Sequence, residues 1–151
     1  MNDRPLPTVI GPTENALRRL LHKTLIGSPI GNYAQWVVMN CADREPLDAS
    51  EFTVRVAEEL KDSPQSINRE VQQLVSGGLL QTSAAGYTLT QFGRNALREG
   101  RKLVRSATAR LMDGVAELDV EATVRTLDRV RANAERELAR QDQASILDRD
   151  A

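Results

Sequence analysis

Reactive side chains are scarce in this chain of 151 residues. Cys41 is the only cysteine and His22 the only histidine. A structural zinc site normally takes four such ligands, and a nucleophile activated by histidine would have to use this one pair. The sequence also lacks a Gly-rich phosphate loop and a paired-carboxylate motif. We therefore expect no metal, no cofactor and no enzymatic activity.

Polar side chains suited to reading nucleic acid are concentrated in "SPQSINREVQQLVSGGLL", residues 63–80. Ser63 can cap a helix, Pro64 suits its first position, and Gly77 with Gly78 supplies a left-handed stop. One face of this helix is apolar, formed by Ile67, Val71, Leu74 and Val75. Arginine can pair with guanine, and asparagine or glutamine with adenine. The expected DNA contacts are Ser63, Gln65, Ser66, Asn68, Arg69, Gln72 and Gln73; the alternative is a merely solvated helix surface.

The elements on either side favour the DNA interpretation. Asp48 and Glu51 have the spacing of a capping box, which predicts a helix over residues 49–61. Two helices separated by so few residues are typical of a helix-turn-helix. Residues 80–89 read as two short strands around a turn. The helix-turn-helix and hairpin together predict a winged helix, with Thr82 and Ser83 of the hairpin as further DNA contacts.

The terminal segments carry apolar stripes that this small lobe cannot bury. Helical periodicity covers residues 13–25, 32–42, 91–115 and about 119–140, with Asp119 as the cap of the last helix. The simplest partner for the terminal helices is a second copy of the chain, so we expect a two-fold dimer. The predicted organisation is a flexible arm (1–12), a helical dimerisation region (13–28 and 100–140), a winged helix-turn-helix domain (30–99) and a frayed tail (141–151).

Composition agrees with a mainly α fold that carries a small β-hairpin. Hydrophobic residues make up 40% of the chain but aromatic residues only 3%, so the core must be mostly aliphatic. No apolar run approaches the length of a membrane span, which predicts a cytoplasmic protein with no membrane partner. The formal net charge of −1 gives no global attraction to DNA, so binding must come from a local surface.

The order of elements and several motifs resemble the multiple-antibiotic-resistance regulator (MarR) family of winged-helix repressors. The resemblance covers residues 13–140 and is carried by "SPQSINREVQQLVSGGLL", "PLDASE", "YTLTQFGR" and the Leu- and Arg-rich last helix. It implies a homodimeric repressor that binds a palindromic operator in double-stranded DNA. In the family, the residues that match Gln65, Ser66 and Arg69 contact the major groove.

The resemblance also implies a small aromatic effector, for which the candidate pocket residues are His22, Tyr33, Trp36 and Met39; core or surface roles are the alternative. Cys41 is either an oxidation sensor or a small core residue. The hairpin departs from the family because its tip reads "TSAAG" and has no arginine for the minor groove. A winged-helix protein that has weak or lost DNA binding and acts through protein contacts is therefore the alternative function.

Overall fold

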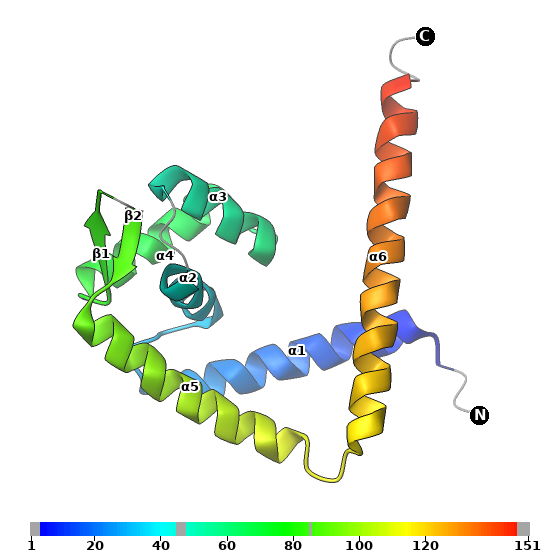
Figure 1. The fold of residues 1–151 in the computed structure, drawn as a ribbon, viewed down its shortest axis with the longest axis horizontal. Coiled ribbons are helices and arrows are strands. Elements are labelled where there is room, and N and C mark those ends of the chain that lie inside the picture. Colours follow the sequence, from blue (N-terminus) through cyan, green and yellow to red (C-terminus); the bar gives the residue numbers. More distant parts are fainter. Residues whose placement is uncertain (1–3, 45–47, 85, 148–151) are drawn as a thin grey trace. The chain divides into compact units, whose positions relative to one another are not determined.

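The computed structural model describes residues 4–44, 48–84 and 86–147. It forms two compact units, Met1–Arg110 and Leu111–Ala151. The described elements are α1 (Leu6–Leu25), α2 (Tyr33–Arg44), α3 (Ala49–Leu60), α4 (Pro64–Ser76), β1 (Leu80–Ser83), β2 (Gly86–Leu89), α5 (Gln91–Leu111) and α6 (Glu117–Leu147). The fold is mainly helical with one two-stranded antiparallel hairpin, which confirms the expected class (Figure 1).

The core of the first unit lies where α2, α3 and α4 meet the hairpin. Ile67, Val71 and Leu74 of α4 are fully buried against Val38 and Phe52 of the neighbouring helices. The hairpin contributes Leu80, Tyr87 and Leu89 to the same cluster, and the Tyr87 ring meets that of Phe52 edge-on at 5.7 Å between centroids. The side of α4 opposite to this core is thereby left free to face a partner.

The hairpin is fixed at its base by the start of α5. Leu80 pairs with Leu89 and Ser83 with Gly86, so the two strands are in register over their whole length. The Thr90 hydroxyl accepts a hydrogen bond from the Gly93 N–H at 2.9 Å, which caps α5. A Cβ on Gly93 would lie 2.0 Å from the Leu79 carbonyl oxygen, so only glycine permits this close approach.

The turn between α3 and α4 is defined by caps at both ends. Asp48 starts α3 by accepting from the Ser50 N–H, and the Ser50 hydrogen bonds lower the pKa of the Asp48 carboxyl. Lys61 ends α3 in the left-handed conformation at φ 54°, and its N–H donates to the Glu58 carbonyl. Such a cap reverses the chain within a few residues, which sets α4 directly after α3.

The first helix is longer than expected. It begins at Leu6, so residues 6–12 are helical rather than an extended arm, and Pro12 lies inside the helix. Pro7 falls in the first turn, where a missing N–H costs nothing because no intrahelical acceptor exists there. Pro12 forfeits one backbone bond only, and the Thr13 hydroxyl donates to the Val9 carbonyl at 2.7 Å beside it. Residues 1–3 of the expected arm lie outside the described residues.

The last helix also differs from expectation at both ends. It begins at Glu117, so Asp119 lies in the first turn and is not the cap. In the first turn its carboxylate still interacts favourably with the positive end of the helix dipole. It continues to Leu147, so residues 141–147 are helical instead of frayed, and residues 148–151 lie outside the described part. None of the described helices is long and apolar enough to cross a bilayer.

Candidate nucleic-acid interface

α4 is held rigidly at both ends. The Ser63 hydroxyl accepts from the Ser66 N–H at 3.1 Å, and Pro64 occupies the first turn, as predicted. At the other end, the Gly78 N–H donates to the Val75 carbonyl and the Leu79 N–H to the Leu74 carbonyl. With Gly78 at φ 72°, this is a Schellman motif. Pro64 has no N–H, and the N–H groups of Ser66 and Ile67 donate to Ser63, so the Gln65 N–H is the first-turn donor left for an anion such as phosphate.

Five of the expected DNA contacts on α4 are exposed, namely Gln65, Asn68, Arg69, Gln72 and Gln73. Gln73 bonds to another side chain, whereas the other four form no side-chain hydrogen bond or ion pair within the described residues. Their donors and acceptors are therefore free to meet base edges or phosphates without breaking an internal contact.

Ser66 and Gln73 are instead engaged in contacts that stabilise the lobe. The Ser66 hydroxyl donates to the Asp62 carboxylate at 3.0 Å, next to the cap. The Gln73 amide oxygen accepts from Gln35 Nε2 at 3.0 Å, and the same nitrogen donates to Glu70 at 2.9 Å. The side-chain amide of the buried Gln35 joins α2 to α4. DNA that contacted Gln73 would compete with this structural hydrogen bond.

Thr82 and Ser83 are both exposed, on opposite faces of β1. Thr82 pairs with Tyr87, and the Ser83 hydroxyl donates to the Gly86 carbonyl at 3.0 Å beside the turn. At the base of the hairpin, Arg94 Nη1 donates to the Leu89 carbonyl at 2.8 Å. Residues 80–89 contain no charged residue, so this hairpin offers hydroxyls and backbone groups rather than cations to a DNA backbone.

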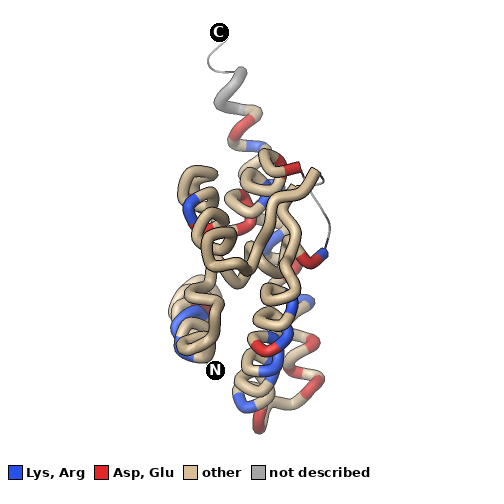
Figure 2. Tube along the Cα trace, turned by 90° about the vertical axis from the view of Figure 1, so that its left-hand side faces the viewer, with Lys and Arg blue, Asp and Glu red and all other residues tan. Residues whose placement is uncertain are grey.

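Charged residues are distributed unevenly over the elements of the first unit. Figure 2 shows the described part of the hairpin without a basic or acidic residue, whereas basic residues are frequent along α5. Arg69 is the only lysine or arginine between Asp62 and Leu89. Each phosphate contact by a cation contributes to affinity and to its salt dependence, so α4 and the hairpin together supply only a small electrostatic component.

Comparison with known proteins identifies the architecture. No family model matches the sequence, and no curated protein sequence matches it. Among solved structures, a MarR family protein of Mycobacterium tuberculosis in complex with DNA has a TM-score of 0.69 at 22% identity, covering 85% of this chain and 98% of its own. The reduced form of MarR from Escherichia coli has a TM-score of 0.69 at 21% identity, covering 84% and 93%. The chain has a MarR-like winged-helix fold. The M. tuberculosis transcriptional regulator MosR agrees, with a TM-score of 0.68 at 18% identity over 88% and 99%.

Within this MarR-like fold, the four candidate effector residues occupy different environments. His22 is exposed on α1, and Met39 is fully buried in the core. Tyr33 and Trp36 are half-buried on α2. The Arg18 guanidinium lies 5.1 Å from the Tyr33 ring centroid. Trp36 packs against Gly100 of α5, where an added Cβ would lie 2.9 Å from the indole ring. Tyr33 and Trp36 are thus the two whose rings remain partly accessible.

Cys41 is half-buried near the C-terminal end of α2. Burial raises the pKa of its thiol, and the neighbouring Glu59 carboxylate, 3.7 Å from Sγ, raises it further. The reactive thiolate is therefore disfavoured at neutral pH, which is the property of a structural cysteine rather than of a redox sensor. Over the described residues, no group of three or more His, Cys, Asp or Glu side chains could hold a metal ion.

The sequence interpretation missed a cluster of cations on α5 of the MarR-like lobe. Arg98, Arg101, Lys102 and Arg105 lie beyond Arg94 on one side of that helix and line a shared cleft. The sequence contains a signal for this cluster: its basic residues are three, four and seven positions apart, which places them on one face of a helix. The predicted domain boundary separates these cations, because the dimerisation region is expected to begin at residue 100, in the middle of the cluster.

Proposed function

We propose that this chain is a dimeric transcriptional regulator that represses genes by binding a palindromic DNA operator through α4. The observation that carries the proposal is the exposed, unpartnered row Gln65, Asn68, Arg69 and Gln72 on a helix whose opposite face is core. The likeness to a MarR family protein in complex with DNA supports the same use of the fold. Thr82 and Ser83 would add hydroxyl contacts to phosphate from the hairpin.

A two-fold dimer is supported by apolar side chains that the single chain leaves uncovered. On α6, Val124, Leu127, Val130 and Leu138 are all exposed and recur at helical spacing. On α1, Leu6, Val9, Ile10 and Leu17 are exposed as well. Stripes of this kind are stable in water when a second chain covers them. A dimer would also present two α4 helices to two half-sites of one operator.

The decisive experiment measures DNA binding by fluorescence anisotropy with promoter fragments from around the gene. Arg69→Ala should weaken specific binding by about 1 to 3 kcal/mol, because one bidentate base contact is lost. Arg110→Ala removes an equally charged, exposed side chain outside α4 and should leave the affinity unchanged. An Arg69→Ala affinity equal to that of the wild type would refute base reading by α4.

The alternative is a MarR-like protein that works through protein contacts and does not bind DNA. It is favoured by the uncharged hairpin and by the Asp62 carboxylate at the start of α4, which repels phosphate. Wild-type dimer that shows no sequence preference for any promoter fragment, even at low salt, would establish this alternative. Pull-down of a defined protein with the folded dimer would then identify the partner.

The proposed function also includes a small effector molecule, an aromatic carboxylate. The M. tuberculosis MarR family protein has also been crystallised in complex with salicylic acid, at 21% identity and a TM-score of 0.65. Here Tyr33 and Trp36 offer partly accessible rings, and Arg18 offers a cation beside Tyr33. Trp36 is the only tryptophan, so intrinsic fluorescence reports this location alone. Salicylate should quench the Trp36 fluorescence saturably, and the quenching should be weaker in Arg18→Gln. A decrease that is linear in salicylate concentration and equal in both proteins would exclude the site.

A further inference from the structure

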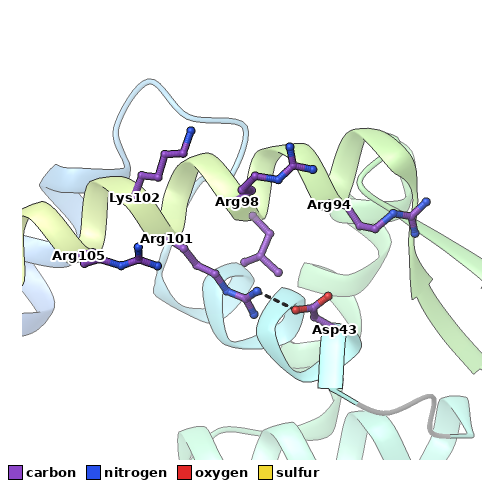
Figure 3. A pocket seen from close by; sticks show the side chains of 7 residues that line it. Asp43, Arg94, Arg98, Arg101, Lys102 and Arg105 are labelled. Atoms are coloured by element: carbon purple, nitrogen blue, oxygen red, sulfur yellow. Dashed lines mark ion pairs between the residues drawn. The ribbon is translucent and has the colours of Figure 1, made fainter.

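One face of α5 carries five cations that the proposed function does not use. Arg94, Arg98, Arg101, Lys102 and Arg105 fall within about 100° of the helix circumference, since each residue turns the helix by about 100°. Together with Asp43 and Leu97 they line a cleft of about 430 Å³, which we call the α5 cleft. Figure 3 shows these side chains projecting from α5, with Asp43 facing Arg101 from α2.

The cleft has far more positive than negative charge. Among the described residues, five cations line it against one carboxylate, that of Asp43, so four positive charges have no counter-charge in the described lining. Lys102 pairs at 2.8 Å with Glu99, which lies outside the cleft and is exposed. Arg105 forms no ion pair or side-chain hydrogen bond within the described residues. Like charges one helical turn apart destabilise the helix, so an anion bound among them would be stabilising.

Arg101 is held in position at the centre of this group. Its Nη1 lies 2.8 Å from Asp43 Oδ2, while Nε and Nη2 donate to Asn40 Oδ1 at 3.2 and 2.9 Å. A guanidinium oriented in this way loses little entropy when it binds a ligand. Arg98, whose only described contact is a 3.0 Å hydrogen bond to Asn95, and Arg105 can close on the ligand from either side.

The α5 cleft is separate from the DNA-reading face. α2 meets α4 through Asn32 and Gln35 near its first turn, whereas Asp43, near its other end, faces the cleft. α2 has 12 residues, so these contacts are roughly 15 Å apart along its axis. A ligand in the cleft would therefore not occupy the position of operator DNA on α4.

We propose that the α5 cleft binds an anion with clustered phosphate groups. Arginine forks match phosphate oxygens in pairs, and a cluster of five cations, only two of which pair with a described carboxylate, suits a multivalent anion better than a monovalent one. Among the described lining residues, Leu97 is the only apolar one and none is aromatic, so an aromatic carboxylate gains little there. The phosphates come either from a free polyphosphate anion or from a nucleic-acid backbone. The proposal does not depend on operator binding through α4.

The test uses calorimetric titration of the full chain with tripolyphosphate. The wild type should bind it saturably, and Arg98→Gln/Arg105→Gln should bind at least about tenfold more weakly, because charge-assisted hydrogen bonds are lost. Arg110→Gln is the matched control: it removes a cation from α5 that lies about 120° away from the cleft face, and its affinity should equal that of the wild type. Circular dichroism verifies that all variants are folded.

The outcomes separate the two sources and can overturn the proposal. If Arg98→Gln/Arg105→Gln loses tripolyphosphate binding but keeps wild-type affinity and salt dependence for DNA, the source is a free polyphosphate. If it also loses affinity for duplexes of any sequence, the source is a nucleic-acid backbone. Absence of wild-type binding to tripolyphosphate, or equal binding by the double variant, refutes the α5 cleft as a phosphate site.

Discussion

At the scale of single residues, the polar side chains of α4 divide into two sets with different roles. Gln65, Asn68, Arg69 and Gln72 have no side-chain partner among the residues that the structure describes, whereas Ser66 bonds to Asp62 and Gln73 bonds to Gln35. Removing an internal partner leaves a buried amide unsatisfied, so a substitution at Gln73 alters both the lobe and any DNA contact. Arg69 is therefore the cleaner position at which to test base reading.

The thiol of Cys41 gives a prediction with a defined sign. Its pKa is raised first by burial and then by the Glu59 carboxylate. Glu59→Gln removes the second cause, so the pKa should fall and the rate of alkylation by iodoacetamide at a fixed, mildly alkaline pH should rise. Glu58→Gln is the matched control, because Glu58 is exposed on the same helix and has no part in raising this pKa. An unchanged rate in Glu59→Gln would contradict the contact.

The same shift links Cys41 to stability. The folded chain holds the thiol proton to a higher pH than the unfolded chain does. The thiol's contribution to the free energy of unfolding is therefore fully present at neutral pH and is lost as the pH rises through the folded-state pKa. Glu59→Gln should reduce this loss, which chemical denaturation at neutral and alkaline pH would detect.

At the scale of elements, the joint between the hairpin and α5 depends on Gly93. Gly93→Ala should destabilise the chain by about 1 to 3 kcal/mol, since its Cβ would overlap the Leu79 carbonyl, a backbone group that cannot move aside without distorting the hairpin. Urea denaturation measures the change, and a free energy of unfolding equal to that of the wild type would refute the close approach.

Local signals in the sequence were sufficient for the lobe. Ser63, Pro64 and the Gly77–Gly78 pair each act on their own helix end, and the apolar spacing of α4 matches the residues buried in the core. The start of α1 was placed too late because Pro12 is normally a helix breaker, and only the structure shows that a single missing bond is tolerated there.

The contacts of the candidate site that were not foreseen are those between distant residues. Gln35 and Gln73 are 38 positions apart, and Asn40 and Arg101 are 61 apart. Periodicity locates a side chain on a face of its own helix but does not say which neighbour that face meets. The roles of Gln73 as a link between helices and of Arg101 as an oriented cation therefore required the fold.

At the scale of the whole molecule, two surfaces of the first unit are chemically distinct. The outward side of α4 carries mostly neutral hydrogen-bonding groups, and the α5 cleft carries concentrated positive charge. Neutral groups discriminate between bases through geometry, whereas clustered cations attract any phosphate-rich anion.

In the proposed dimer, each of these surfaces occurs twice, and α6 of the second unit supplies part of the contact between the chains. Leu127 lies in the middle of the exposed apolar stripe of α6, so a charge there would have to be buried if a second chain covers the stripe. Leu127→Asp should weaken dimerisation at least about a hundredfold, because an unpaired buried charge costs several kcal/mol. Ala132→Asp adds the same charge about 140° around the same helix and should leave the dimer intact. Sedimentation velocity over a range of concentrations distinguishes the two, and an unaltered dimer in Leu127→Asp would place the interface elsewhere.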